Sequence, residues 1–262
     1  MHEQISIAVP TRHRPDILSI FVDKIYQTTK DRKNKPHLQI IYDHPQQNSR
    51  PTNIGIDYPI SELTLYDKSS LTELWNLSII LAPTDWVLIC NDDIEFKDGW
   101  LEYLEETINS GKFLGIHLLN YGAMCFHKSM ILRVGWFDER FRNGGYEDND
   151  YQLRIDEAGI RNLIDWSAAH ITINGPLEIT KFAIHTKHLH KSKIGWGDPV
   201  NGQWMMEKWG RTSGFANPSF RRQLDKDWHP RYTMRYTEKY KQDPVWMNIG
   251  TQSIKERRPV YG

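Results

Sequence analysis

The sequence predicts an α/β protein in which helices flank a mostly parallel central sheet, followed by an irregular, partly helical C-terminal extension. Three observations carry this prediction. Short apolar runs alternate with segments of helical periodicity over residues 5–110, which is typical of parallel strands joined by helices. Acidic residues directly follow one apolar run, at the end of a strand where such sheets bind ligands. Regular patterns fade after about Thr180.

Strands are predicted where a short apolar run is bounded by proline, glycine or polar residues. In chain order these runs are Ile5–Pro10, His37–Asp43, Leu63–Asp67, Asp85–Cys90, Phe113–Lys128 and Arg161–Ile171. The run Phe113–Lys128 is long enough for more than one strand, and Arg161–Ile171 for a strand and a turn.

Helices are predicted where apolar residues recur at helical spacing. These segments are Asp16–Thr29, Ser70–Ala82, Gly99–Gly111, Ser129–Phe137 and Glu147–Gly159. Asp16 is expected to cap the first of them, because an aspartate side chain accepts hydrogen bonds from the free N–H groups of a first turn.

The composition is that of a soluble globular protein. The chain has 262 residues, of which 39% are hydrophobic and 25% charged, so disorder throughout is excluded. No apolar run approaches the roughly 18 residues that a membrane span needs, and the N-terminus lacks the apolar core of a signal peptide. Cys90 and Cys125 form neither a disulfide framework nor a CxxC metal pattern. We therefore expect a cytoplasmic protein without a transmembrane segment.

The zero net charge hides an asymmetry along the chain. Residues 181–262 contain 16 lysines and arginines and 7 acidic residues, a net charge of +9, so residues 1–180 carry −9. An acidic first part and a basic second part indicate two functions. The sequence therefore predicts two regions, 1–180 and 181–262.

The first candidate for chemistry is the triplet Asn91-Asp92-Asp93, which follows a predicted strand. Adjacent carboxylates repel each other unless a cation or a proton lies between them. Mg²⁺ or Mn²⁺ held by a carboxylate and bridging a diphosphate would remove this repulsion. The alternative is an aspartate-rich turn that caps the helix near Trp100.

The second candidate is the acidic cluster Glu147, Asp148 and Asp150, which begins a predicted helix after two glycines. A carboxylate here could act as a general base, with its acidic neighbours raising its pKa. The alternative is a structural role, since acidic side chains stabilise helix N-termini through the helix dipole.

Arginine and histidine supply the remaining candidates. Arg12 and Arg14 follow the strand that ends at Pro10-Thr11, where a guanidinium could reach phosphate oxygens. The sequence contains no GxGxxG and no GxxxxGK[ST] pattern, so it predicts neither a dinucleotide-binding fold nor a P-loop.

His170 follows a predicted strand, and His185 lies near His188 and His190. Imidazole could join Asp93 on Mn²⁺, although packing or surface exposure is the ordinary role of a histidine. No cysteine lies near this histidine group, so it is a weak indication of zinc.

Over roughly Ile5 to His170, these motifs in this order resemble the family 2 inverting glycosyltransferases, which have the GT-A fold. Those enzymes open with a strand that ends in Pro-Thr and an arginine, as in "AVPTRHRPD". They carry an aspartate after the second strand and an asparagine in the helix before the metal strand. The matching donor-binding residues are Pro10, Thr11, Arg14, Asp43 and Asn76.

The metal motif of this family is Asp-x-Asp or Asn-x-Asp, and "NDD" fits the second form. The resemblance places Asp93 on the metal and Asp92 beside the ribose or the metal. A histidine after a later strand completes the metal shell in many members; His170 is the first choice and His185 the substitute.

The most specific part of the resemblance is "VGWFDERFRNGGYEDND", which is similar to the family's "VGxFDE" turn followed by Glu-Asp. In the family, the aspartate of this pair deprotonates the acceptor hydroxyl. The resemblance therefore implies that Asp148 is the general base, with Glu147 beside it.

The implied protein is a metal-dependent glycosyltransferase with a GT-A catalytic domain at 1–180. It would use Mn²⁺ or Mg²⁺ and a nucleotide-sugar donor, with UDP- and GDP-sugars favoured. The sugar would pass, with inversion, to the hydroxyl of a glycan, lipid-linked or other acceptor; retention stays open because geometry decides it. A catalytically inactive sugar- or nucleotide-binding module on the same fold is the alternative from another class.

The extension 181–262 combines basic residues with tryptophans, among them Trp196, Trp204, Trp209, Trp228 and Trp246. Aromatic faces stack on sugars and bases, and basic side chains attract phosphates. We expect this extension to contribute to the acceptor site. The alternatives are a packed lid with solvated charges and a surface that binds nucleic acid, as in a transferase acting on modified DNA.

Overall fold

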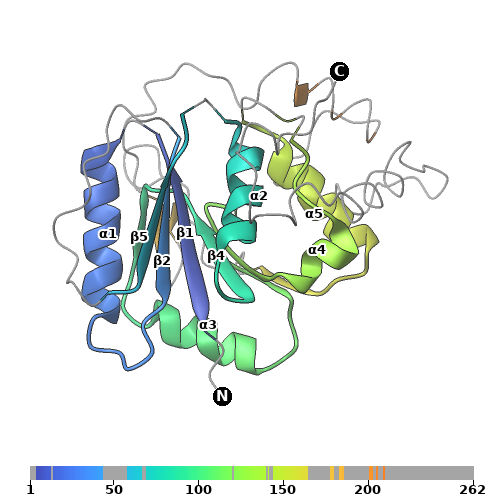
Figure 1. The fold of residues 1–262 in the computed structure, drawn as a ribbon. Coiled ribbons are helices and arrows are strands. Elements are labelled where there is room, and N and C mark those ends of the chain that lie inside the picture. Colours follow the sequence, from blue (N-terminus) through green and yellow to red (C-terminus); the bar gives the residue numbers. More distant parts are fainter. Residues whose placement is uncertain are drawn as a thin grey trace.

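The computed structural model describes the residues 4–12, 14–43, 58–66, 69–119, 121–139, 141, 144–164, 178–179, 183–185, 201, 202, 205 and 209. Within these ranges the chain forms a sheet covered by helices on both faces (Figure 1). No helix in the described part is long and apolar enough to cross a membrane.

A seven-stranded sheet has the strand order β3-β2-β1-β4-β7-β6-β8. Its strands are β1 (Ile5–Thr11), β2 (His37–Tyr42), β3 (Ile60–Thr64), β4 (Trp86–Cys90), β6 (Gly115–Leu119), β7 (Ala123–His127) and β8 (Asn162–Ile164). The strand β7 runs antiparallel to both of its neighbours, and every other pairing in this sheet is parallel. The predicted mostly parallel sheet is confirmed.

The helices form two layers, one on each face of the sheet. The helices are α1 (Pro15–Thr29), α2 (Leu71–Leu81), α3 (Trp100–Asn109), α4 (Ser129–Val134) and α5 (Glu147–Glu157). Apolar residues of α1 and α3 share one buried cluster with the sheet, and those of α2, α4 and α5 share another. Figure 1 shows α1 on the opposite side of the sheet from α2 and α5. Because both faces are covered, the inner strands are continuous apolar runs; all residues of β1 and β4 are buried.

The ends of the helices follow local sequence signals. The helix α1 begins with Pro15, whose fixed φ suits a first helical position. Asp16 therefore lies inside the first turn and not at the cap, so the predicted Asp16 cap is wrong. Ser70 and Glu73 form a capping box at the start of α2. The helix α4 ends at Val134 because Gly135 adopts a φ of 87°, three residues before the predicted end.

A small second sheet contains β5 (Ile94–Phe96), β10 (Ala183–His185) and β9 (Glu178–Ile179), all antiparallel. The strand β5 begins directly after Asp93, and its residue Ile94 pairs with His185 of β10. Two of these strands have three residues and one has two, too few for a hydrophobic pattern to predict them.

The third strand of the large sheet lies at Ile60–Thr64, where the sequence predicted Leu63–Asp67. The pairing with β2 decides the position, since Leu38 pairs with Ile60 and Tyr42, the last residue of β2, pairs with Thr64. The strand lies at the edge of the sheet, and the exposed polar residues Ser61 and Glu62 separate Ile60 from Leu63, so the apolar run began only at Leu63.

Candidate functional site

The site begins where the strand order of the large sheet reverses. From β1 the chain continues to β2 and β3 on one side, and β4 lies on the other side of β1. At such a point the connections leave in opposite directions and open a crevice outside the carboxyl ends of the two strands. Thr11 and Arg14 follow β1 here, and Asp92 and Asp93 follow β4.

Arg14 joins the two aspartates. Its Nε lies 3.2 Å from Oδ2 of Asp92, and its Nη1 lies 3.2 Å from Oδ2 of Asp93; Nη2 also bonds to Oδ1 of Asp92. Thr11 donates a hydrogen bond of 2.6 Å to Asp92 Oδ2. Thr11, the last residue of β1, therefore supplies a hydroxyl donor to the carboxylates after β4. Arg14, just beyond β1, supplies the positive charge that stabilises them.

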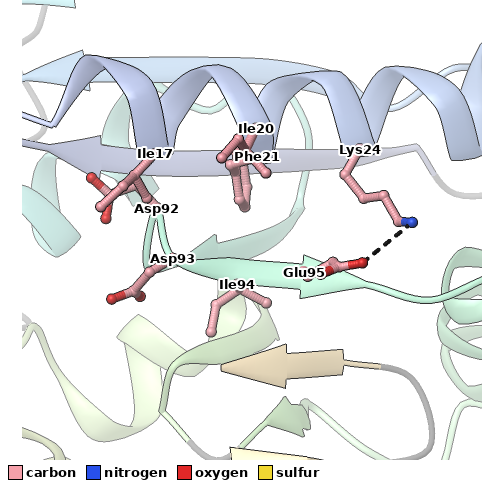
Figure 2. Close-up of a pocket in the computed structure, with 8 residues that line it drawn as sticks. All are labelled: Ile17, Ile20, Phe21, Lys24, Asp92, Asp93, Ile94 and Glu95. Atoms are coloured by element: carbon pink, nitrogen blue, oxygen red, sulfur yellow. Dashed lines mark ion pairs between the residues drawn. The ribbon is translucent and has the colours of Figure 1, made fainter. Parts of the chain in front are cut away.

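Both aspartates are buried, with exposed fractions of 1% for Asp92 and 3% for Asp93. Figure 2 shows both in the turn that leads into β5, with Asp92 beside Ile17 of α1 and the Asp93 carboxylate pointing away from that helix. Burial raises the pKa of Asp92, and Arg14 and Thr11 oppose that rise. Neither aspartate caps α3, whose N-cap is Gly99 without a side-chain bond. The turn is therefore a charged site rather than a helix cap.

The donor atoms in this turn suit a divalent cation. Carboxylate oxygens are the ligands that Mg²⁺ and Mn²⁺ prefer, and these ions complete their shells with phosphate and water. The described part of the chain contains no group of three or more His, Cys, Asp or Glu side chains that could hold a metal. His170 lies outside the described residues; His185 is described by its backbone, which pairs with the residue after Asp93. In the described part of this turn, Asp92 and Asp93 are the carboxylates whose chemistry suits such an ion.

Asp43 lies at the carboxyl end of β2, beside the end of β1. Its N–H donates to the Thr11 carbonyl at 3.0 Å, and its Oδ1 accepts from Ser69 N at 2.8 Å. Arg12 bonds to its other carboxylate oxygen and, at 2.7 Å, to the Ser69 carbonyl. Pro10, in β1, pairs with Ile41 in β2. The predicted residues Pro10, Thr11, Arg14, Asp43 and Asp92 therefore gather at one edge of the sheet.

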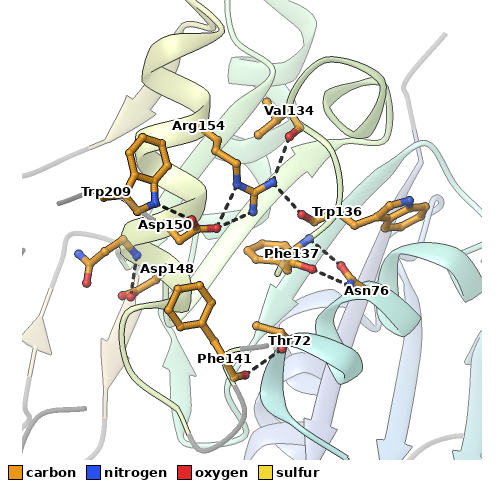
Figure 3. Close-up of polar contacts among 11 residues, drawn as sticks. Thr72, Asn76, Val134, Trp136, Phe137, Phe141, Asp148, Asp150, Arg154 and Trp209 are labelled. Atoms are coloured by element: carbon orange, nitrogen blue, oxygen red, sulfur yellow. Dashed lines mark hydrogen bonds and ion pairs between the residues drawn. The ribbon is translucent and has the colours of Figure 1, made fainter. Parts of the chain in front are cut away.

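Asn76 makes a different set of contacts. Its Nδ2 donates to the Phe137 carbonyl at 3.0 Å, and its Oδ1 accepts from Phe137 N at 2.9 Å (Figure 3). Nδ2 also donates to Glu139 Oε1 at 2.8 Å. The side chain is fully buried. These contacts fix the turn after α4 against α2, which is a structural role; the predicted role of Asn76 in donor binding stays a prediction.

The acidic start of α5 contains two carboxyl groups in a buried setting. Glu147 is 5% exposed and Asp148 is half-buried, with its Oδ1 accepting from Asn149 N at 2.8 Å. Burial, and next the charge of Asp148, raise the pKa of Glu147 to about 8; burial also raises the pKa of Asp148. Glu147 therefore holds a proton at neutral pH, and Asp148 is more basic than an exposed aspartate, which suits a general base.

Asp150, the third acid of this cluster, is part of a structural network. Arg154 bonds to Asp150 Oδ2 through Nε at 3.0 Å and Nη2 at 2.9 Å. Its Nη1 donates to the carbonyls of Val134 and Trp136 at 3.0 and 2.8 Å, at the end of α4 (Figure 3). Arg154 was not predicted from the sequence, although four-residue Asp–Arg spacing on a helix is a usable signal for such a pair.

Tyr121 and Gly122 connect the two acidic regions. Gly122 accepts a backbone hydrogen bond of 2.9 Å from Asn91, beside the Asp92–Asp93 turn. Tyr121 donates to Gln152 of α5 at 2.9 Å. Burial raises the pKa of Tyr121, and the next cause is the charge of Asp148. The turn after β4 and the start of α5 therefore belong to one region of the molecule.

Comparisons with known proteins support the fold. No protein-family model matches the chain, and no curated protein matches it. The mannosyltransferase PcManGT from Pyrobaculum calidifontis, solved in complex with GDP-Man and Mn²⁺, has a TM-score of 0.54 and 13% identity, over 62% of this chain and 55% of that one. This similarity shows the fold, and the predicted GT-A-type architecture is confirmed.

Two structures of TarS from S. aureus are also similar, at 10% identity over 58% of this chain. The 1–349 fragment has a TM-score of 0.47 over 54% of its length, and the longer structure 0.48 over 33%. The chain thus spans about half the length of the mannosyltransferase and of the TarS fragment.

Asn76→Ala is expected to lower the free energy of unfolding by about 2–3 kcal/mol, because it leaves the buried amide and carbonyl of Phe137 without their partner. Urea unfolding would measure the change. The matched control is Asn34→Ala, at an exposed position, for which a change within about 0.5 kcal/mol is expected. Equal stability of the two variants would contradict the supporting role of Asn76.

Glu147→Gln is expected to gain stability relative to the native chain as the pH rises from about 5 to about 8. The folded-state pKa of Glu147 is about 8, against an ordinary value of 4.5. Its protonated carboxyl contributes stability that is full below the unfolded pKa and is lost as the pH approaches the folded pKa. Glutamine does not titrate, so the difference in the free energy of unfolding between the two chains should grow by more than about 1 kcal/mol over this pH range. Urea unfolding would measure it. A pH-independent difference would refute the raised pKa.

Proposed function

We propose that this protein is a metal-dependent glycosyltransferase that moves a sugar from a nucleotide-sugar donor to an acceptor hydroxyl. The observation that carries the proposal is the buried Asp92–Asp93 pair, bound by Arg14 and Thr11 at the switch point of a GT-A-type sheet. A compact, doubly negative site beside an arginine suits a diphosphate bridged by a divalent cation.

The donor lies along the carboxyl ends of β1, β2 and β4 in this proposal. Arg14 and Thr11 turn from the aspartates towards the phosphate oxygens, and Asp43 and Asp92 contact the nucleoside. Asp93 would hold Mn²⁺ or Mg²⁺, and His170 or His185 would complete the shell. When bound, the metal neutralises negative charge that develops on the diphosphate as it leaves. A UDP- or GDP-sugar is favoured; the similar mannosyltransferase was solved with GDP-Man and Mn²⁺.

Asp148 acts as the general base. Its carboxylate accepts the proton of the acceptor hydroxyl, the hydroxyl oxygen forms a bond to the anomeric carbon, and the bond from that carbon to the diphosphate breaks. The displacement is in line, so the configuration inverts. Glu147 is neutral at the working pH because its pKa is raised to about 8. It therefore adds no second negative charge beside the base.

The division of the chain at residue 180 is part of the proposal, with residues 1–180 binding the donor and 181–262 contributing to the acceptor site. The acceptor is a glycan, a lipid-linked sugar or another hydroxyl compound. Cys90 and Cys125 are both buried and free, which fits the reducing cytoplasm that we propose as the location.

Asp148→Asn is expected to reduce the rate of sugar transfer by about 10²–10⁴-fold, the usual contribution of a general base. Affinity for the nucleotide sugar should stay unchanged, because the donor contacts lie on β1, β2 and β4. Transfer from labelled donors and binding calorimetry would measure the two quantities. The matched control is Asp156→Asn, at an exposed position on the same helix, and native transfer rates are expected for it. Transfer by Asp148→Asn at the native rate would refute the assignment of the base.

A further inference from the structure

The turn that leads into α5 has an unfavourable backbone conformation. Gly144, Gly145 and Tyr146 have φ angles of 86°, 95° and 75°, and Tyr146 is the single non-glycine residue with positive φ in the described part of the chain. A residue with a Cβ atom adopts this region at a cost, and it persists where the surrounding structure holds it in place. Glu147 and Asp148 follow this turn directly.

Residues from the C-terminal side of the chain hold this turn. Asn201 Nδ2 donates to the carbonyls of Gly144 and Gly145, both at 3.2 Å. Gly202 packs against the ring of Tyr146, since a methyl group added at Gly202 would lie 3.5 Å from its Cε2. These contacts therefore involve both the glycine carbonyls of the turn and the ring of the strained tyrosine.

Trp209 anchors the same part of the chain to α5. Its Nε1 donates to Asp150 Oδ1 at 2.7 Å, and both residues are buried, with exposed fractions of 1% and 0% (Figure 3). A buried cluster surrounds this contact and consists of Phe141, Leu153, Met205 and Trp209, with Tyr146 packed against it. The anchor therefore lies two residues from Asp148, on the helix that carries it.

We propose that Asn201 and Trp209 are positioning residues that hold the Gly144–Tyr146 turn and the first turn of α5, and so set the position of the Asp148 carboxylate. Asn201, Gly202, Met205 and Trp209 together form what we term the C-terminal clamp. The effect of the clamp on catalysis rests on the proposed function. The contacts between the clamp and the turn do not depend on that function. In this proposal, the described residues within 201–209 of the extension complete the site for the acceptor proton.

The test compares Trp209→Phe with Trp75→Phe in the full chain. Both substitutions remove an indole from a buried position, but Trp75 Nε1 makes no hydrogen bond to the described residues, so Trp75→Phe is the matched control for lost ring volume. Two quantities would be measured: hydrogen exchange of the amides of residues 144–148, and steady-state transfer kinetics with the nucleotide sugar that supports turnover.

Trp209→Phe is expected to speed exchange in residues 144–148 and to lower kcat, each by about tenfold or more, the effect of a lost hydrogen bond to a charged group. The KM for the donor should stay within about twofold, because the contacts given above for the clamp are to the Gly144–Tyr146 turn and α5 and not to the proposed donor residues after β1, β2 and β4. Trp75→Phe is expected to change neither quantity. Asn201→Ala, which leaves the buried cluster intact, should reproduce the pattern if Trp209→Phe folds poorly.

Three outcomes would overturn the proposal. Unchanged exchange in residues 144–148 would refute the clamp itself. Faster exchange with a native kcat would refute its role in positioning Asp148, as would an equal fall of kcat in Trp209→Phe and Trp75→Phe. If the native chain transfers no sugar from any donor, the proposed function fails instead, and the exchange measurement alone decides whether the clamp exists.

Discussion

The structure depends on how two adjacent carboxylates are kept buried. Asp92 and Asp93 follow β4 with almost no exposed surface, and such a pair is unfavourable without compensating charge. Arg14 supplies that charge and Thr11 a hydrogen bond. Because these partners must come from the end of β1, the parallel pairing of β1 with β4 and the start of α1 at Pro15 are both needed for the site.

The acidic residues in the first turn of α5 fall into two classes. Asp150 is compensated by Arg154 and Trp209 and therefore stabilises the packing of α4, α5 and the C-terminal side of the chain. Glu147 and Asp148 lack a cation of this kind in the contacts described above, and burial raises their pKa values. A fixed charge suits a structural anchor, whereas a carboxyl group with a raised pKa suits proton transfer. The acidic cluster thus contains one structural anchor, Asp150, and two carboxyl groups whose pKa values are raised.

The large sheet was predictable because its inner strands are buried on both faces and read as apolar runs such as Ile5–Pro10 and Asp85–Cys90. The gathering of Thr11, Arg14, Asp43 and Asp92 followed from the rule that parallel strands place their carboxyl ends at one edge. Contacts between distant residues were not predictable: Trp209 and Asp150 lie 59 residues apart, and Asn76 and Phe137 lie 61 apart. No local pattern encodes such pairs. The strands of the second sheet were too short to be recognised.

The central claim is that Asp93 binds a divalent cation together with a nucleotide sugar. Thermal unfolding with UDP-, GDP-, CMP- and dTDP-sugars, each with and without Mn²⁺ or Mg²⁺, tests it most directly in the native chain, in Asp93→Asn and in the exposed control Asp98→Asn. We expect one donor to raise the Tm of the native chain and of Asp98→Asn by several degrees only when metal is present, and to leave Asp93→Asn unchanged. No stabilisation by any donor under any metal condition, or an equal stabilisation of Asp93→Asn, would contradict the claim.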